Sequence, residues 1–274
     1  MIARGAITKR AADEQIPAQT IERDYVLAHL CADIGALDDS RLVFKGGTLL
    51  RLCYFETYRY SADLDFSATG GLSRSAALAL VAAAATACRQ RLELPTLELS
   101  SDSDSAATAA IMFAGPLGSR PRSLKLDISD TELVESHRRV SHQRTWPDLP
   151  HGAAIEGYTL DEVAAEKLRC IAERTQCRDL YDFHHLLENS YIEPIEAWEL
   201  YCRKAANDLA HGRQRTPPRQ WATRFELRLA TYRQRWEQEL GDYLRDVPAF
   251  AEVERQTRRW LRPVLAAAAT LERS

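Results

Sequence analysis

The hydrophobic pattern of this chain changes character at Thr159, and that change constrains the fold more than any other feature. Before Thr159, short apolar runs alternate with glycine turns and one alanine-rich run, a pattern typical of strands mixed with helices. After it, apolar residues recur at helical spacing. We therefore predict an α+β fold, in which a core at 1–150 with a small mixed sheet is followed by a helical domain at 151–274.

Turn and capping residues divide these two parts into elements. The first part is predicted to hold helices at 20–34, 48–54 and 73–92 and strands at 41–45, 61–67, 96–99, 107–113 and 123–129. Ser73 is the expected N-cap of the alanine-rich helix, and Thr159 with Glu162 forms a capping box for the first helix of the second part. Helices are expected there at 159–174, 179–189, 194–210, 221–240 and 248–272.

Composition excludes several classes of protein. With 45% hydrophobic and 27% charged residues, the chain has the balance of a folded globular protein. It contains no long uncharged apolar run and no apolar core near its start, which favours a cytoplasmic protein with no membrane segment. The six cysteines are scattered without a CxxC pair, so we expect reduced, packed thiols in place of a zinc site.

Two aspartates dominate the chemistry that the sequence predicts. Asp63 and Asp65 lie two residues apart in a predicted strand, so both side chains project from the same face. Paired carboxylates suit Mg²⁺ or Mn²⁺, and Mg²⁺ usually takes one or two carboxylates together with substrate phosphates and water. The pair therefore predicts a divalent-metal site.

A glycine pair precedes the aspartates. Gly46 and Gly47 separate a short predicted strand from a short predicted helix, where glycine lets the backbone approach a ligand and leaves N–H groups at the helix start. Such a turn predicts a binding site for the phosphates of a nucleoside triphosphate.

A third carboxylate strengthens the prediction. An acidic-x-acidic triplet alone is weak, since 39 acidic residues produce several by chance, and we interpret Asp102 with Asp104 as one of these. Asp127 stands isolated in an apolar strand after Lys125. A strand, a Gly-Gly turn, a helix, paired aspartates and a third aspartate together favour a nucleotidyltransferase site.

At this point the chain resembles the AbiEii/AbiGii-type toxins, which include MenT-like proteins and are the toxin halves of bacterial type IV toxin–antitoxin and abortive-infection systems. The resemblance lies in five motifs in order, at 44–51, 59–67, 125–128, 162–167 and 178–182, and more loosely in 236–250. The wider superfamily often carries Gly-Ser where this chain has Gly47-Thr48, but the hydroxyl is retained.

The resemblance implies a polymerase-β-like nucleotidyltransferase core and a role for each matching residue. Asp63, Asp65 and Asp127 would be the metal ligands, with Lys167 and Asp182 from the helical domain completing the catalytic set. The nucleotide would be bound by the remaining motif residues, namely Lys45, Gly46, Gly47, Thr48, Arg59, Ser61, Lys125 and Asp179. It also implies transfer from a nucleoside triphosphate to the 3′ end of tRNA, which blocks translation, and a winged-helix AbiEi-like antitoxin as partner.

Several residues have a second interpretation. A lysine on an amphipathic helix, such as Lys167, is usually solvated, and Asp179 is also a natural N-cap. His184 and His185 are interpreted as packing or surface residues, since a metal site built on paired aspartates uses oxygen.

Arginines crowd the segments 203–235 and 255–262. In 221–236 they alternate with aromatic residues, which favours either a surface that binds RNA by charge and base stacking or a solvated helix with a tryptophan core. Other acceptors remain open: a small molecule or a protein, or no transfer at all in a silent nucleotide- or RNA-binding module.

Overall fold

The computed structural model describes residues 1–100, 108–118, 120–189, 191–213 and 215–273. Its contacts divide into two units. The first comprises 1–131, 137–158 and 242–245, and the second comprises 132–136, 159–241 and 246–274. The short segment at 242–245 returns to the first unit, where the Tyr60 N–H donates to the Tyr243 carbonyl at 2.8 Å. The paired Asp102 and Asp104 lie outside the described residues.

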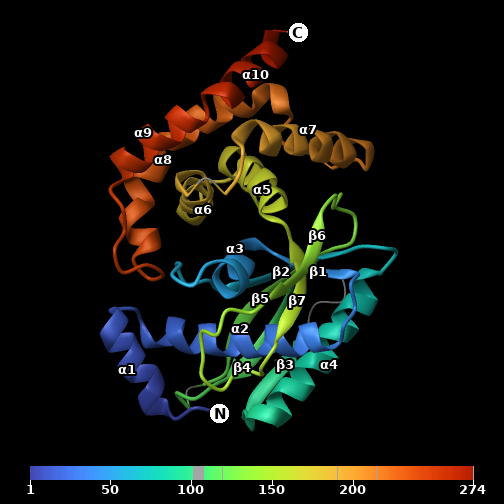
Figure 1. Ribbon diagram of the computed structural model, residues 1–274, viewed down its shortest axis with the longest axis vertical. Coiled ribbons are helices and arrows are strands. Elements are labelled where there is room, and N and C mark those ends of the chain that lie inside the picture. Colours follow the sequence, from blue (N-terminus) through green and yellow to red (C-terminus); the bar gives the residue numbers. More distant parts are fainter. Residues whose placement is uncertain (101–107, 119, 190, 214, 274) are drawn as a thin grey trace. The chain divides into compact units, whose positions relative to one another are not determined.

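The first unit is built on a mixed seven-stranded sheet (Figure 1). The strand order is β3-β4-β5-β2-β1-β7-β6. Strand β2 is parallel to β5 and β1 is parallel to β7, while the other neighbours are antiparallel. The bounds are β1 Leu42–Lys45, β2 Asp63–Ala68, β3 Thr96–Leu99, β4 Thr108–Ala114, β5 Arg122–Ser129, β6 His137–Ser141 and β7 Ala154–Tyr158. The predicted mixed sheet is confirmed.

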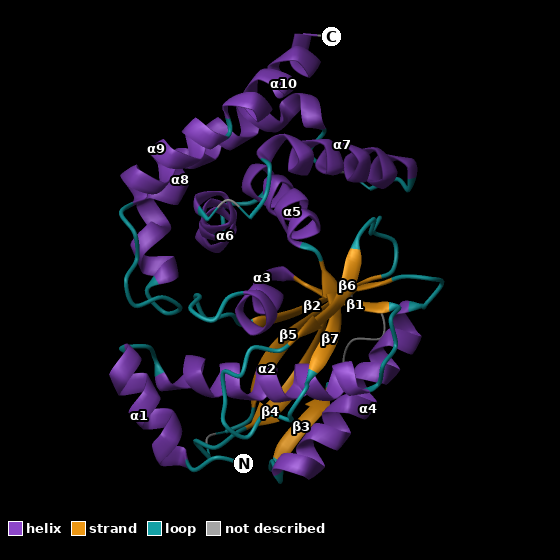
Figure 2. Ribbon diagram, in the orientation of Figure 1, coloured by secondary structure: helices purple, strands orange, loops and turns teal. Residues whose placement is uncertain are grey.

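Three helices of the first unit, α2, α3 and α4, contact this sheet, and α1 contacts α2 (Figure 2). They are α1 Arg4–Glu14, α2 Ala18–Ala36, α3 Gly46–Leu49 and α4 Arg74–Leu92, with a π-helix at Leu50–Tyr54 directly after α3. Ser73 caps α4 as predicted, because its hydroxyl accepts the Ala76 N–H at 3.3 Å. The helix expected at 48–54 therefore begins at Gly46 and widens to a π-helix in its second half.

Two strands and one helix were not predicted. Helix α1 follows directly on the chain start, and β6 has a single buried residue, Val140, so it lacks the alternation that marks a strand. Strand β7 contains Glu156 and Gly157, which are poor strand formers. Pairing with β1 and β6 forms β7, and such pairing is invisible in the local sequence.

The second unit is helical over its described residues. Its elements are α5 Leu160–Glu173, α6 Cys177–Glu188, α7 Pro194–Ala210, a 3-10 turn at Pro218–Gln220, α8 Trp221–Leu240, α9 Phe250–Trp260 and α10 Arg262–Arg273. Thr159 caps α5, where its hydroxyl accepts the Glu162 N–H. The prediction of a single helix at 248–272 is wrong. The helix is interrupted at Leu261, because Pro263 has no N–H to continue the helical hydrogen bonds.

Large aromatic side chains form the centre of the second unit. Trp221, Tyr232 and Trp236 from α8 are buried, and the Trp221 indole donates to the Leu168 carbonyl at 2.6 Å. The tryptophan-core interpretation of 221–236 is confirmed, and stacking of bases on these rings is excluded because the rings are inside the fold. All six cysteines are free, as expected. Over the described residues, no helix is long and apolar enough to cross a membrane.

Candidate functional site

The three predicted metal-binding aspartates lie on two neighbouring strands of the first unit. Asp65 on β2 is the direct partner of Asp127 on β5, and Asp63 is the partner of Lys125. Because partners in a parallel pair point to the same side, and because positions two apart in a strand do so as well, all three carboxylates belong to one face of the sheet. Residues far apart in the sequence are thereby brought together.

Alternation along the strands explains why this face is polar. Leu64 and Phe66 on β2 are fully buried, as are Leu124 and Leu126 on β5, so these apolar side chains occupy the opposite face. The aspartates between them are only half buried. The apolar residues anchor the strands while the carboxylates keep access to solvent.

The glycine turn lies directly against this carboxylate row. Gly46 follows β1, has a φ of +79°, and approaches Asp65 so closely that an added Cβ would stand 2.6 Å from the Asp65 Oδ2 atom. The left-handed conformation and the lack of a side chain are both required here. Lys45, the last residue of β1, is the register partner of Asp65 on its other side.

Arg59 occupies the space next to the second glycine. Its guanidinium is buried against Gly47, where any Cβ would collide with the Nη2 atom, and its Nη1 donates to the Tyr60 carbonyl at 2.9 Å. A guanidinium beside backbone N–H groups is a combination that can bind phosphate oxygens.

Two predicted hydroxyl groups tie the turn to the aspartate strand. The Thr48 hydroxyl is buried and lies 2.5 Å from the carbonyl oxygen of Asp63 and 2.8 Å from the Ser61 hydroxyl. These hydrogen bonds hold the start of α3 against the start of β2. They give Thr48 and Ser61 a positioning role for Asp63.

The sequence did not single out Tyr158, the last residue of β7, whose ring lies near the Lys45 ammonium. The Lys45 ammonium lies 5.9 Å from the centroid of the Tyr158 ring. The Tyr158 hydroxyl lies 2.7 Å from the hydroxyl of Ser67, a residue of β2. The only available signal was an aromatic residue at the end of the apolar run before the capping box.

The other predicted site residues belong to the second unit and form an ion cluster of their own. The Lys167 ammonium on α5 lies 2.8 Å from Asp179 and 2.6 Å from Asp182, both on α6. All three are buried. Sequence reasoning missed the fourth member, Arg174, whose guanidinium donates to both Asp179 oxygens at 2.7 and 3.2 Å.

These partners decide the ionisation of Asp179. Burial by itself raises the pKa of this carboxyl, but the charges and hydrogen bonds of Lys167 and Arg174 outweigh burial and hold the pKa well below its usual range. The alternative interpretation of Asp179 as an N-cap is wrong, because α6 begins at Cys177 and Asp179 lies in its first turn. Lys167 is likewise not a solvated surface lysine.

The two histidines are not arranged as ligands. His184 is buried, its Nε2 lies 2.8 Å from the Gln256 side-chain oxygen, and its ring packs near that of Trp260. His185 lies beside the ring of Tyr181. Both make packing contacts, as interpreted from the sequence.

The aspartate face suits a divalent cation, because its donors are carboxylates and the strand register puts Asp65 beside Asp127. Carboxylate oxygens are ligands that Mg²⁺ prefers. In the described part of the chain, no three His, Cys, Asp or Glu side chains form a ready-made metal cluster. Mg²⁺ does not need one, because it commonly binds to one or two carboxylates and completes its shell with phosphates and water.

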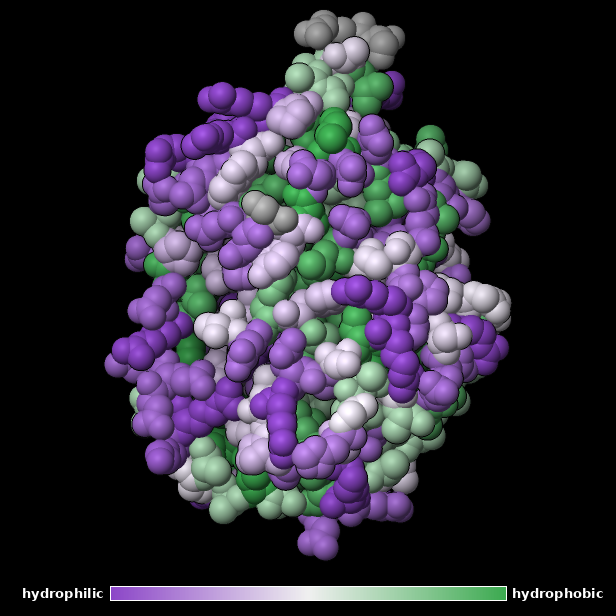
Figure 3. Space-filling model, viewed as in Figure 1, coloured by the Kyte–Doolittle hydropathy of each residue, from purple (hydrophilic) through white to green (hydrophobic). Residues whose placement is uncertain are grey.

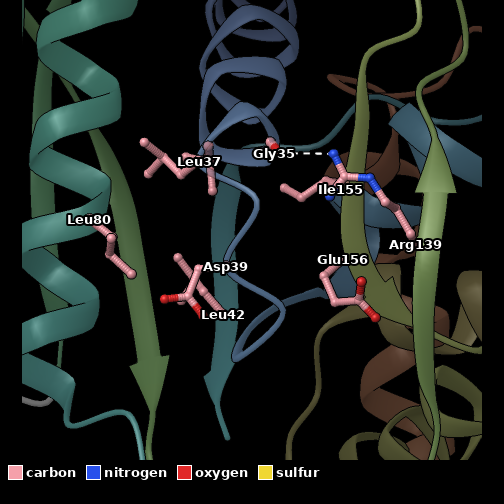
Figure 4. Close-up of a pocket in the computed structure, with 9 residues that line it drawn as sticks. Gly35, Leu37, Asp39, Leu42, Leu80, Arg139, Ile155 and Glu156 are labelled. Atoms are coloured by element: carbon pink, nitrogen blue, oxygen red, sulfur yellow. Dashed lines mark hydrogen bonds between the residues drawn. The ribbon is translucent and has the colours of Figure 1, made fainter.

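A small cavity elsewhere in the first unit does not compete as a site. It lies at the end of α2, has a volume of about 10 Å³ and is lined in part by Gly35, Leu42, Arg139 and Glu156 (Figure 4). Arg139 closes one side by donating to the Gly35 carbonyl at 3.1 Å. This volume is about that of one water molecule.

A mixed sheet that aligns aspartates beside a glycine turn, followed by a helical unit, has the architecture of a nucleotidyltransferase. The sequence matches, over residues 30–262, the family described as Nucleotidyl transferase AbiEii toxin, Type IV TA system. This match covers most of the chain, and the protein therefore belongs to the AbiEii family of nucleotidyltransferase toxins. The resemblance stated from the sequence motifs is confirmed. A search of curated proteins found no match.

Solved structures show the same fold. MenT4, a nucleotidyltransferase toxin from Mycobacterium tuberculosis H37Rv, superposes with a TM-score of 0.73 at 21% identity, with 100% of each chain covered. JHP933 from Helicobacter pylori superposes with a TM-score of 0.56 at 17% identity, covering 94% of this chain and 97% of that one. At these identities the likeness concerns the fold alone.

Proposed function

We propose that this toxin transfers a nucleotidyl group from a nucleoside triphosphate to an RNA acceptor, the 3′ end of tRNA, and so blocks translation. The observation that carries the proposal is the shared face of Asp63, Asp65 and Asp127 beside the Gly46 turn. Family membership supports the transferase activity. The 3′-end acceptor comes from the resemblance of the motifs.

The first unit supplies the nucleotide site in this proposal. The backbone of Gly46 and Gly47 binds the phosphates, and Arg59, Lys45 and Lys125 add positive charge around them. Thr48 and Ser61 hold the turn against the Asp63 strand. When bound to the aspartates, Mg²⁺ or Mn²⁺ would neutralise phosphate charge and orient the α-phosphate.

Transfer then requires an attacking hydroxyl and a base. Asp127 accepts the proton of the acceptor hydroxyl, whose oxygen attacks the α-phosphorus in line while pyrophosphate leaves. The motifs also give Lys167 and Asp182 a catalytic role, and their 2.6 Å ion pair holds the Lys167 ammonium in place. Most of the rate comes from positioning and charge neutralisation.

A cognate antitoxin is the expected protein partner, since the family is one half of a type IV toxin–antitoxin system. We propose that it is a winged-helix protein of the AbiEi kind. Both the toxin and its tRNA acceptor would then act in the cytoplasm, within an abortive-infection response.

One experiment tests the proposal. The protein is incubated with Mg²⁺, each labelled nucleoside triphosphate in turn, and total tRNA, beside an Asp63→Ala/Asp65→Ala variant. Label on tRNA with the wild type and none with the variant is expected. Label on a small molecule or protein instead would overturn the RNA acceptor, and no label on any acceptor would indicate a silent binding module.

The metal is tested in the same assay. EDTA should abolish transfer, and Mg²⁺ or Mn²⁺ in excess should restore it, because the carboxylates alone repel the triphosphate. An Asp13→Ala variant, which removes an exposed carboxylate of α1, is the control for the loss of negative charge.

A further inference from the structure

Four arginines of the second unit line one hollow on its surface. Arg255, Arg258 and Arg259 come from α9, and Arg262 is the first residue of α10. The hollow measures about 360 Å³, and its fifth lining residue is Gln256. In Figure 3 the surface over the α8 and α9 region is strongly hydrophilic.

The spacing of these arginines explains how they share one side. Arg255, Arg258 and Arg259 are three and four residues apart on α9, so they lie along one face of that helix, and Arg262 follows after the break at Leu261. The opposite face of α9 is apolar at Phe250 and Val253, which are buried in the unit, and Val264 of α10 is buried as well. The apolar stripe therefore fixes which way the arginines point.

The arginines differ in their partners. Arg258 forms a two-pronged ion pair with Glu226 at 2.6 Å, and Arg255 pairs with Glu252. Within the described residues, no carboxylate pairs with Arg259 or Arg262, and both are exposed. Half of the positive charge in the hollow thus remains uncompensated by acidic groups of the chain.

Helix stability does not account for this arrangement. A cation in the last turn of α9 is favoured by the helix dipole, which covers Arg258 and Arg259. Arg262 begins α10, where the dipole opposes a positive charge, and the first turn of α10 holds no acidic residue. The dipole of α10 therefore does not account for an arginine at this position.

The chemistry of the lining selects the occupant. It consists of guanidinium groups and one amide, with no apolar side chain to form the core of a protein interface. Guanidinium groups bind phosphate oxygens through paired hydrogen bonds. The whole chain carries a net charge of −3, so a polyanion must be held at a locally positive surface.

We infer that this arginine hollow binds the sugar–phosphate backbone of the RNA acceptor. The inference rests on the proposed RNA acceptor and adds where on the second unit that acceptor is held. The contact is with phosphates, so it contributes affinity and position without reading the base sequence.

The test compares salt dependence of RNA binding. Fluorescently labelled total tRNA is titrated with full-length wild type, Arg259→Ala/Arg262→Ala and the control Arg4→Ala/Lys9→Ala, which removes two exposed charges from α1. Each lost phosphate contact lowers the log–log salt slope by roughly 0.7 to 0.9. Between 50 and 200 mM salt, the wild type should therefore lose about tenfold more affinity than the hollow variant.

Further arms separate the outcomes. The charge-retaining Arg259→Lys/Arg262→Lys variant should recover most of the slope, and binding of nucleoside triphosphate should be the same in all variants. If the wild type binds tRNA and the hollow variant keeps the wild-type slope, the location is wrong while the RNA acceptor stands. If the wild type does not bind tRNA, the acceptor and the inference fall together. Loss of antitoxin neutralisation with unchanged tRNA binding would assign the hollow to a protein partner and overturn the inference.

Discussion

Gly46 shows how a single residue couples backbone conformation to the proposed chemistry. Its φ of +79° is strained for any other residue, and an added Cβ meets the Asp65 carboxylate. Gly71 has nearly the same φ of +77° but nothing within 4 Å of an added Cβ. Substituting each of these two glycines therefore distinguishes the cost of backbone strain, which both share, from the steric effect on Asp65, which only Gly46 has.

We predict that Gly46→Ala loses nucleotidyl transfer and that Gly71→Ala keeps it. Both variants should lose roughly 1–2 kcal/mol of unfolding free energy, the cost of the left-handed conformation. Urea denaturation measures the stability and the tRNA-labelling assay measures the transfer. Wild-type transfer by Gly46→Ala would contradict the placement of Asp65 in the site.

Asp127 is the second residue whose role can be isolated. If Asp127 is the base, its removal should lower the rate of nucleotidyl transfer by roughly 10²–10⁴-fold, the usual contribution of a positioned proton acceptor. We predict that Asp127→Asn loses transfer to this extent while nucleotide binding, measured by calorimetry, changes little. Asp13→Asn is the matched control, and an Asp127→Asn enzyme with near-normal turnover would reject the assignment.

At the scale of elements, α5 and α6 are joined by buried charges. Lys167, Arg174, Asp179 and Asp182 bring two cations and two carboxylates together. Removing one member leaves another charge buried without its partner, which typically costs about 3–5 kcal/mol. The cluster therefore serves stability as well as any role of Lys167 in transfer.

The lowered pKa of Asp179 makes this stability depend on pH. The folded protein holds the proton less readily than the unfolded chain, whose Asp pKa is about 3.9, so the stabilisation is present above that pH and is lost as the pH falls below it. We predict that Asp179→Asn is less stable at pH 7 and loses less stability than the wild type on acidification. Urea unfolding from pH 7 to pH 3, beside the exposed-site control Asp242→Asn, measures this. Parallel pH curves for wild type and variant would refute it.

At the scale of the whole molecule, we propose that both units contribute to toxicity. The aspartate face belongs to the first unit, and the Lys167 cluster and the arginine hollow belong to the second. A toxin that modifies tRNA should arrest protein synthesis when expressed without its antitoxin.

We predict that expression of the wild type stops incorporation of labelled amino acids and that Asp63→Ala/Asp65→Ala does not. The physical reason is that removal of two carboxylates leaves the metal and the α-phosphate unpositioned. Equal amounts of folded protein, checked by immunoblot and circular dichroism, are the control. Continued synthesis with the wild type would contradict the proposed block of translation.

Local patterns in the sequence determined much of this protein. The change at Thr159, the Ser73 cap, the order of β1 to β5 and the shared face of Asp63 and Asp65 all follow from residue spacing and backbone propensity, which act over a few residues. The family could also be recognised from short motifs, and its match is confirmed.

Tertiary structure alone decided the rest, because it depends on pairing between distant segments. Strands β6 and β7 form only through their neighbours, and the pairing of β2 with β5 places Asp127 beside Asp65. The same holds for Arg174 beside Asp179, and for the α8 aromatics, which are buried because other helices cover them. A sequence states which side chains share a face, but long-range packing determines what that face meets.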